Sequence, residues 1–101
     1  MTHPLSGLKV IELAEDPAGE LEGRLLAEMG AEVIKLEPPE GAPTRRIGPF
    51  ANGEAGTETS LNFWYYNGNK RSVVLDLPAG RERLDALLAS ADIFISTLQP
   101  Q

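Results

Sequence analysis

The chain has 101 residues, no cysteine, one histidine and a formal charge of −6, from nine basic and fifteen acidic side chains. This length predicts a single domain over residues 1–101 and excludes a two-domain enzyme. Without cysteine, the chain cannot form disulfides, iron–sulfur clusters or cysteine–zinc sites, and one histidine cannot form a histidine cluster, so we expect no metal. The acidic balance disfavours a nucleic-acid partner.

Residues 1–7 lack the basic stretch and apolar core of an export signal, and no apolar run approaches the roughly 18 residues of a membrane-spanning helix. We therefore expect a cytoplasmic protein with no membrane partner. The acidity is uneven, since residues 1–40 hold three basic and nine acidic side chains, whereas residues 41–101 hold six of each. The neutral part has the better candidates for a phosphate contact.

The first 40 residues have the pattern of a strand, a helix and a second strand. Residues 10–13 and 32–36 are apolar, strand-like runs. Between them, helical spacing places one apolar stripe at Leu21, Leu25, Leu26 and Met29. This stripe predicts a helix that buries these residues and points Glu20 elsewhere, and Gly30 is a natural end for it. The crossover is long enough to make the two strands parallel.

A long irregular segment follows, because residues 38–59 contain four prolines and four glycines. We predict a functional or flexible loop there. Residues 60–67 then hold four aromatic side chains and predict a short helix with Ser60 as its N-cap. Such aromatics either stack on a flat ring or form a core or subunit contact.

The last third repeats the strand–helix–strand pattern. Residues 72–76 and 93–95 read as strands, and helical spacing joins Leu84, Leu87, Leu88 and Ala91. Pro78 suits the first turn of this helix, and Asp76 is a candidate cap. Two βαβ units predict an α/β fold with a parallel sheet.

Gly19 and Gly23 follow the first strand, and Glu37 ends the second. This outline is similar to a dinucleotide site, in which glycines admit a phosphate and an acidic group binds a ribose. The G-x-G-x-x-G spacing is missing, and the nearby carboxylates would repel a pyrophosphate. The alternative is that both glycines allow close helix packing.

Several charged groups could belong to a site or to a solvated surface. Lys70 and Arg71 form a compact cationic turn that suits a phosphate. Arg45 and Arg46 have the same two interpretations, with a solvated turn favoured. Glu12 and its neighbours at the end of the first strand have a solvated cluster as their default interpretation. With His3 near the terminus and no partner visible, no catalytic triad is predicted.

The ordered motifs resemble those of a known family. The segments that carry the resemblance are residues 4–13 (PLSGLKVIEL), 18–19 (AG), 25–37 (LLAEMGAEVIKLE), 67–77 (NGNKRSVVLDL) and 91–92 (AD). Together they look like the N-terminal segment of a class III CoA-transferase of the CaiB/BaiF type. This family includes formyl-CoA transferase, carnitine CoA-transferase and α-methylacyl-CoA racemase.

The resemblance implies a Rossmann-like open parallel sheet that binds coenzyme A or an acyl-CoA, in a homodimer of interlocked chains. It places CoA against three segments, whose members are Asp16, Pro17 and Ala18, then Leu75, Asp76, Leu77 and Pro78, then Thr97, Leu98 and Gln99. It also gives Lys70 and Arg71 a structural or phosphate-side role. Such enzymes move CoA between an acyl-CoA and a carboxylate through an aspartyl anhydride.

The family's catalytic aspartate corresponds to a position downstream of these residues, so no catalytic residue is assigned and the segment is expected to be inactive alone. It would be part of a longer protein, and an unfinished sheet would pair with another copy or with the rest of that protein. The alternative reaction is that of a racemase.

The chain also departs from the family pattern. Pro38 and Pro78 stand where relatives often have a cation, and Glu20 follows Gly19 where relatives have proline. Residues 96–101 read STLQPQ where the family typically has ENFRPG. These changes support a second hypothesis, a non-catalytic binding or assembly module that has lost CoA. A third is an NAD-type binding domain.

Overall fold

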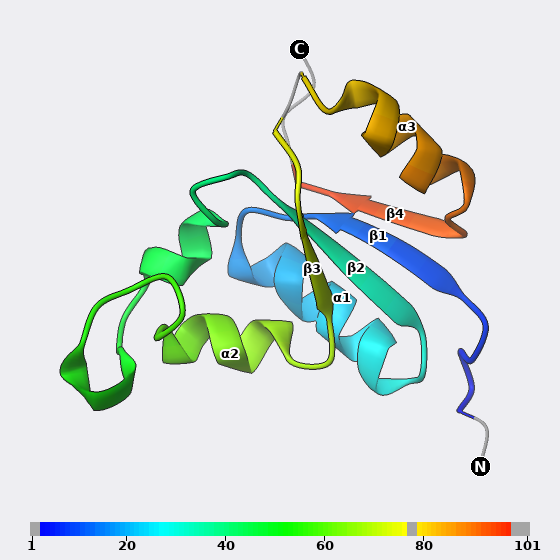
Figure 1. Ribbon diagram of the computed structural model, residues 1–101. Helices are drawn as coiled ribbons and strands as arrows, with labels where there is room; N and C mark the ends of the chain where they lie inside the picture. Colours follow the sequence, from blue (N-terminus) through cyan, green and yellow to red (C-terminus); the bar gives the residue numbers. More distant parts are fainter. Residues whose placement is uncertain (1–2, 77–78, 98–101) are drawn as a thin grey trace.

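A computed structural model describes residues 3–76 and 79–97 (Figure 1). Its strands are β1 (Lys9–Leu13), β2 (Glu32–Glu37), β3 (Arg71–Val74) and β4 (Ile93–Ser96). Its α-helices are α1 (Pro17–Glu28), α2 (Leu61–Asn67) and α3 (Arg81–Ala89), and two short 3-10 helices are η1 (Pro43–Arg46) and η2 (Ala51–Gly53). No helix in the described ranges has the length and apolar character needed to cross a bilayer.

The four strands form one parallel sheet in the order β3-β2-β1-β4. The predicted Rossmann-like α/β fold is therefore confirmed. The chain builds outward from β1 to β2 and β3, then crosses back to add β4 on the other side of β1. The strands of the second predicted unit, β3 and β4, thus lie at opposite edges instead of side by side.

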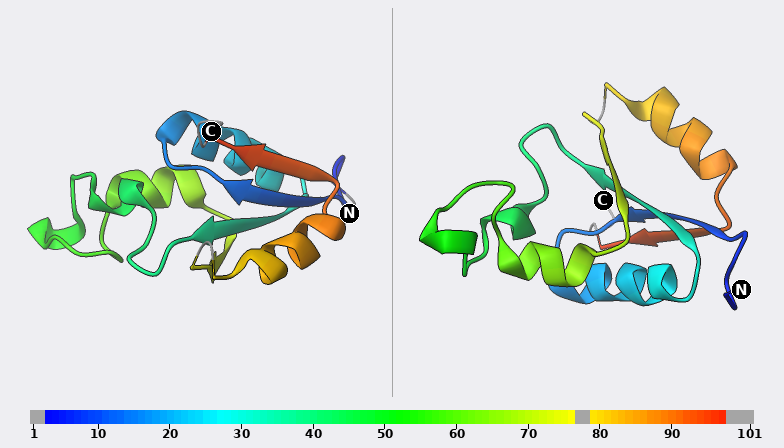
Figure 2. Two further views of the ribbon diagram at one scale, coloured as in Figure 1. Left: turned by 90° about the horizontal axis from the view of Figure 1, so that it is seen from above. Right: turned by 60° about the horizontal axis from the view of Figure 1, so that its bottom comes forward.

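Helices cover both faces of the sheet (Figure 2). On one face, α1 and α2 lie next to each other, and Leu26 of α1 packs on Val10 and Val33. On the other face, Leu84 of α3 packs on Ile11 and other buried residues of the sheet. The central strands β1 and β2 are therefore buried on both faces, as strands of parallel sheets usually are, whereas the edge strands β3 and β4 are mostly exposed.

Local sequence explains where several helices begin and end. Asp16 is the N-cap of α1, where its carboxylate accepts a hydrogen bond from the Gly19 backbone N–H at 2.8 Å. Gly30 ends that helix with φ = +103°, a conformation that favours glycine. Ser60 caps α2 as predicted, accepting from the Phe63 N–H. The cap predicted at Asp76 is wrong, because α3 begins after Gly80 without a side-chain cap.

The buried face of α1 differs from the prediction. Leu21, Leu25 and Met29 are exposed, with 38%, 51% and 46% of their surface accessible. Glu20 instead is completely buried. The stripe rule fails because ion pairs on the sheet side, described below, hold α1 in this orientation.

The long loop, residues 38–59, is anchored to the domain. It contains η1 and η2, and its residues Thr44 and Arg45 are buried. Phe50 forms an isolated antiparallel bridge with Ser60, just before α2. The loop therefore runs out from the end of β2, packs through η1 against α2 and leads into that helix (Figure 1).

Candidate site at the carboxyl edge of the sheet

The carboxyl ends of all four strands lie at one edge of the sheet, because the strands are parallel. The strand order reverses between β1 and β4, and open α/β sheets bind ligands in the crevice outside such a switch point. The loop from β1 to α1 and the turn after β4 meet there. The switch point thus brings together two of the three predicted binding segments, and the third follows β3 at the same edge of the sheet.

Hydrogen bonds join Thr97 to Leu13 and Glu15, which lie just before the segment 16–18. The Glu15 N–H donates to Thr97 Oγ1 at 2.9 Å, and the Thr97 N–H donates to the Leu13 carbonyl at 3.2 Å. A Cβ added at Gly19 would collide with the methyl group of Thr97. The structure therefore brings Asp16, at the start of α1, and Thr97 into one rigid cluster. Leu98 and Gln99 lie outside the described residues.

The β3 segment meets the end of β1 in a pocket of about 290 Å³. Its lining residues are Leu13, Glu15, Pro38, Pro39, Glu40, Leu75 and Asp76. Leu75 is buried and donates its N–H to the Glu37 carbonyl at 2.7 Å, whereas Asp76 is exposed. The other two predicted residues of this segment, Leu77 and Pro78, lie outside the described part of the chain.

Lys70 and Arg71 do not form one cationic surface. The Lys70 ammonium points inward to Glu12, at 2.6 Å from Oε1, and it also donates to the Glu20 carbonyl and Asn67 Oδ1. Arg71 is exposed and lies 3.8 Å from Glu32. Burial lowers the pKa of Lys70 below its usual 10.5, although Glu12 acts in the opposite direction.

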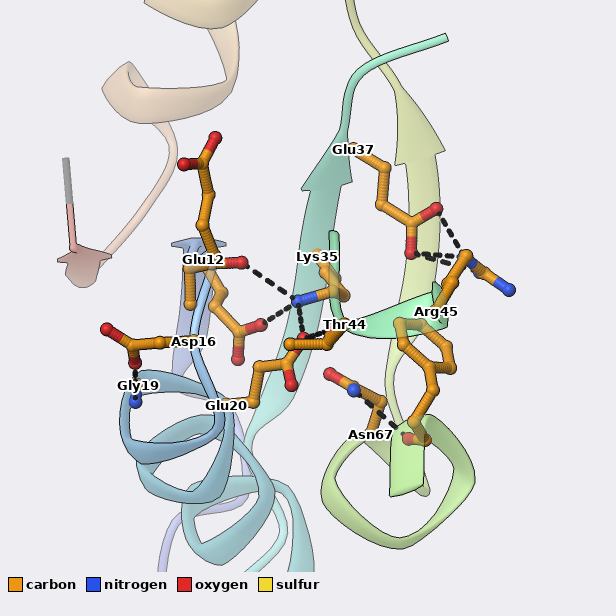
Figure 3. A network of polar contacts seen from close by, with 12 residues as sticks. Glu12, Asp16, Gly19, Glu20, Lys35, Glu37, Thr44, Arg45 and Asn67 are labelled. Carbon is orange, nitrogen blue, oxygen red and sulfur yellow. Dashed lines mark hydrogen bonds and ion pairs between the residues drawn. The ribbon is translucent and has the colours of Figure 1, made fainter. Parts of the chain in front are cut away.

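A buried charge cluster lies between α1 and the sheet (Figure 3). We define it as Glu12, Glu20, Lys35 and Lys70. Lys35 Nζ lies 2.8 Å from both Glu12 Oε2 and Glu20 Oε2, and these three side chains are at most 1% exposed. The expectation of a solvated Glu12 is therefore wrong. Lys35 also donates to the Ala14 carbonyl at 3.3 Å, which anchors the end of β1.

The two glycines of α1 serve this packing. A Cβ at Gly23 would collide with Glu12 Oε1, so the close-packing alternative is confirmed for Gly23 and, through Thr97, for Gly19. The sequence also contained a signal for the cluster. Glu12 and Lys35 are opposite charges that interrupt the apolar runs at residues 10–13 (VIEL) and 33–36 (VIKL), and they are register partners on β1 and β2.

A second buried ion pair closes the base of the long loop. The Arg45 guanidinium lies 2.9 Å from Glu37 Oε1 and 3.9 Å from the Phe63 ring centroid. Arg45 is 9% exposed, so the favoured prediction of a solvated turn is wrong for Arg45, whereas Arg46 is exposed. Because Arg45 occupies the Glu37 carboxylate, that group is not available to a ribose. The described residues contain no group of three or more His, Cys, Asp or Glu that could hold a metal ion.

The model of CoA-transferase family III matches residues 5–101. The chain is 44% identical over 101 residues to a succinate–glutarate CoA-transferase of Agrobacterium fabrum, covering 95% of this chain and 25% of that protein. It is 40% identical over 97 residues to a cinnamoyl-CoA:phenyllactate CoA-transferase of Clostridium sporogenes, covering 94% and 24%.

The crystal structure of a CAIB/BAIF family protein from Brucella suis matches with a TM-score of 0.80 and 41% identity, covering 93% of this chain and 25% of that one. The chain thus spans about a quarter of the length of the relatives it matches. The similarity to these relatives, in sequence and in fold, extends over at least 93% of this chain.

Proposed function

The chain belongs to CoA-transferase family III, and we propose that it supplies the coenzyme A-binding part of an enzyme that transfers CoA between an acyl-CoA and a carboxylate. The observation that carries this proposal is the meeting of Thr97 with Glu15 and with the first turn of α1, capped by Asp16, at the switch point of a doubly wound sheet. We further propose that the protein acts as a homodimer in the cytoplasm.

The carboxyl edge offers two environments for parts of CoA. The first turn of α1 carries the positive end of a helix dipole, which favours phosphate groups. The nearby pocket is lined by Glu15, Glu40 and Asp76 and by apolar Leu13 and Leu75. Three carboxylates repel phosphate but accept hydrogen bonds. We therefore assign the phosphates to the loop that includes Pro17 and Ala18, and the adenine or ribose to the pocket.

The remaining contacts are proposed from the resemblance alone. We propose that Leu77, Pro78 and Leu98 also contact CoA. Lys70 is assigned the structural role, because its ammonium is held by Glu12 and Glu20. The nucleophilic carboxylate of the transferase reaction is not assigned to this chain, so its residues bind and orient CoA.

Calorimetric titration with CoA, followed in parallel by Trp64 fluorescence, tests the proposal. We expect saturable binding to CoA and none to NADH. Asp16→Ala should weaken CoA binding by roughly tenfold, since loss of an N-cap loosens the first turn of α1. Asp85→Asn, on α3 and away from the edge, is the matched control. Binding of NADH without CoA by the folded chain would overturn the assignment.

A non-catalytic assembly module is the second candidate function, and one observation favours it. The outer faces of α1 and α2 expose large apolar side chains, namely Leu21, Leu25, Met29, Leu61, Trp64 and Tyr65. Contiguous exposed apolar surface often marks an interaction site. Absence of CoA binding, together with self-association in analytical ultracentrifugation, would favour this function over the first.

A further inference from the structure

Glu20 occupies an unusual position for a carboxylate. It lies in the first turn of α1, is completely inaccessible to solvent, and points toward the sheet. Its Oε2 lies 2.8 Å from Lys35 Nζ and accepts a hydrogen bond from the Thr44 hydroxyl at 2.6 Å (Figure 3). Glu20 therefore connects three parts of the molecule, namely α1, β2 and the long loop.

Thr44 brings the loop to this carboxylate. It belongs to η1 and is 1% exposed. Its neighbour Arg45 is bound to Glu37, the last residue of β2. Two consecutive loop residues thus bind two buried carboxylates that come from different elements.

A tight turn lies between Glu37 and these two loop residues. The Gly41 N–H donates to the Pro38 carbonyl at 2.8 Å, so residues 38–41 project between β2 and η1 as one unit. Pro38 and Pro39 of this turn line the pocket at the carboxyl edge and also a second pocket of about 390 Å³ on the β3 side. The position of the turn therefore determines the shape of both pockets.

The buried charge cluster also requires the negative charge of Glu20. Lys35 and Lys70 bring two positive charges into the buried charge cluster, and Glu12 and Glu20 bring two negative charges. A buried charge without a partner is strongly unfavourable. Glu20 therefore balances the cluster and holds the loop through the same carboxylate.

We propose that Glu20 is a positioning residue, which fixes the 38–41 turn through Thr44 and thereby sets the shape of the pocket at the carboxyl edge. The anchoring of the loop depends on the contacts alone. The consequence for CoA affinity rests on the proposed function.

Amide hydrogen exchange of the full chain, followed by mass spectrometry, measures the anchoring directly. In Thr44→Val the hydroxyl is lost without leaving a new unpaired charge, because Lys35 still binds Glu20. We expect exchange in residues 39–47 to accelerate roughly tenfold or more, as a hydrogen bond to a charged group is lost. Exchange in β1 should stay unchanged, and Thr44→Ser should restore protection.

Glu20→Gln separates the two roles of the carboxylate. The amide oxygen still accepts a hydrogen bond from Thr44, while the negative charge is lost. The urea midpoint of unfolding should therefore fall, whereas amide exchange of the loop should change less than in Thr44→Val. Glu22→Gln, two residues further along on the exposed surface of α1, is the matched control. It should change neither the urea midpoint nor the exchange of the loop. If Glu20→Gln does not fold, the comparison of Thr44→Val with Thr44→Ser still tests the proposal.

Unchanged loop exchange in a folded Thr44→Val variant would overturn the proposal. CoA titration of the same proteins is a separate measurement. If the wild-type chain binds no CoA, the proposed function fails while the exchange result still stands. If it binds CoA, Thr44→Val should weaken the affinity severalfold, and unchanged affinity would contradict the link between turn and pocket.

Discussion

Helices α1 and α3 cover opposite faces of the same sheet in opposite ways. Helix α3 buries Leu84 against an apolar cluster and exposes its charged residues. Helix α1 buries Gly19, Glu20 and Gly23 and exposes Leu21 and Leu25. Helix α3 is held by hydrophobic packing, whereas α1 adds close backbone approach and buried ion pairs to the packing of Leu26 on an apolar cluster.

The difference has a physical origin in the strands beneath. The face under α3 presents Ile11, Ile34 and Leu36, so burying apolar area there is favourable. The face under α1 presents Glu12 and Lys35, which must be paired once water is excluded. A helix with a carboxylate and small residues meets that requirement, and a leucine stripe does not.

The largest effect should come from breaking the charge cluster under α1. Lys35→Met leaves Glu12 and Glu20 with one ammonium group, so we expect the free energy of unfolding to fall by about 3–5 kcal/mol in urea at pH 7. Lys9→Met, in the half-exposed start of β1, is the control and should cost far less. A loss below about 1 kcal/mol would remove the distinction between the two helices.

Truncating the apolar anchor of α3 should cost somewhat less. Leu84 is 8% exposed and packs on Leu75 and Ile11, so Leu84→Ala should lower the free energy of unfolding by about 3 kcal/mol through a cavity. Arg83→Ala, exposed on the same helix, should leave it nearly unchanged. Equal losses in both variants would show that α3 is not held by its apolar face.

A smaller effect on stability, which depends on pH, is expected from Lys70 in the charge cluster under α1. Burial lowers the pKa of Lys70, so between that value and 10.5 the unfolded chain binds more protons than the folded one. The free energy of unfolding of the wild type, relative to Lys70→Met, should therefore rise with pH in this window. Urea unfolding from about pH 8 to 10.5 measures it. A difference that falls with pH would reverse the sign and the assigned cause.

The smallest effect is expected on the outer face of α1. Leu25 is 51% exposed, so Leu25→Ser should change the free energy of unfolding by no more than about 0.5 kcal/mol. The adjacent Leu26 packs against Val10 and Val33, and Leu26→Ser should cost several times more. A large loss for Leu25→Ser, dependent on protein concentration, would show that another copy covers this face in solution.

Much of the fold could be predicted from local patterns. Strand runs, the cap at Ser60 and the stop at Gly30 depend on neighbouring residues, so they are visible in the sequence. The strand order was not predicted, because pairing of β4 with β1 joins residues some eighty positions apart. The orientation of α1 was wrong because long-range ion pairs with Lys35 outweighed its leucine stripe.

The predicted binding residues stay a prediction. The resemblance indicated Asp16 and Thr97, and the structure places both of them next to Gly19. The roles of Glu20 and Arg45 were not predicted, because each depends on a partner, Thr44 or Glu37, whose position is set by the folding of the long loop. The matched charges of Glu12 and Lys35 were the one local signal that could have indicated a buried cluster.

The close approach at Gly23 has an evolutionary consequence. A side chain at position 23 would occupy the space of the Glu12 carboxylate, which in turn binds Lys35 and Lys70. Positions 12 and 23 should therefore covary across homologous sequences. A lineage that shortens the acid to aspartate gains room for alanine at position 23, whereas one that retains glutamate must also retain glycine.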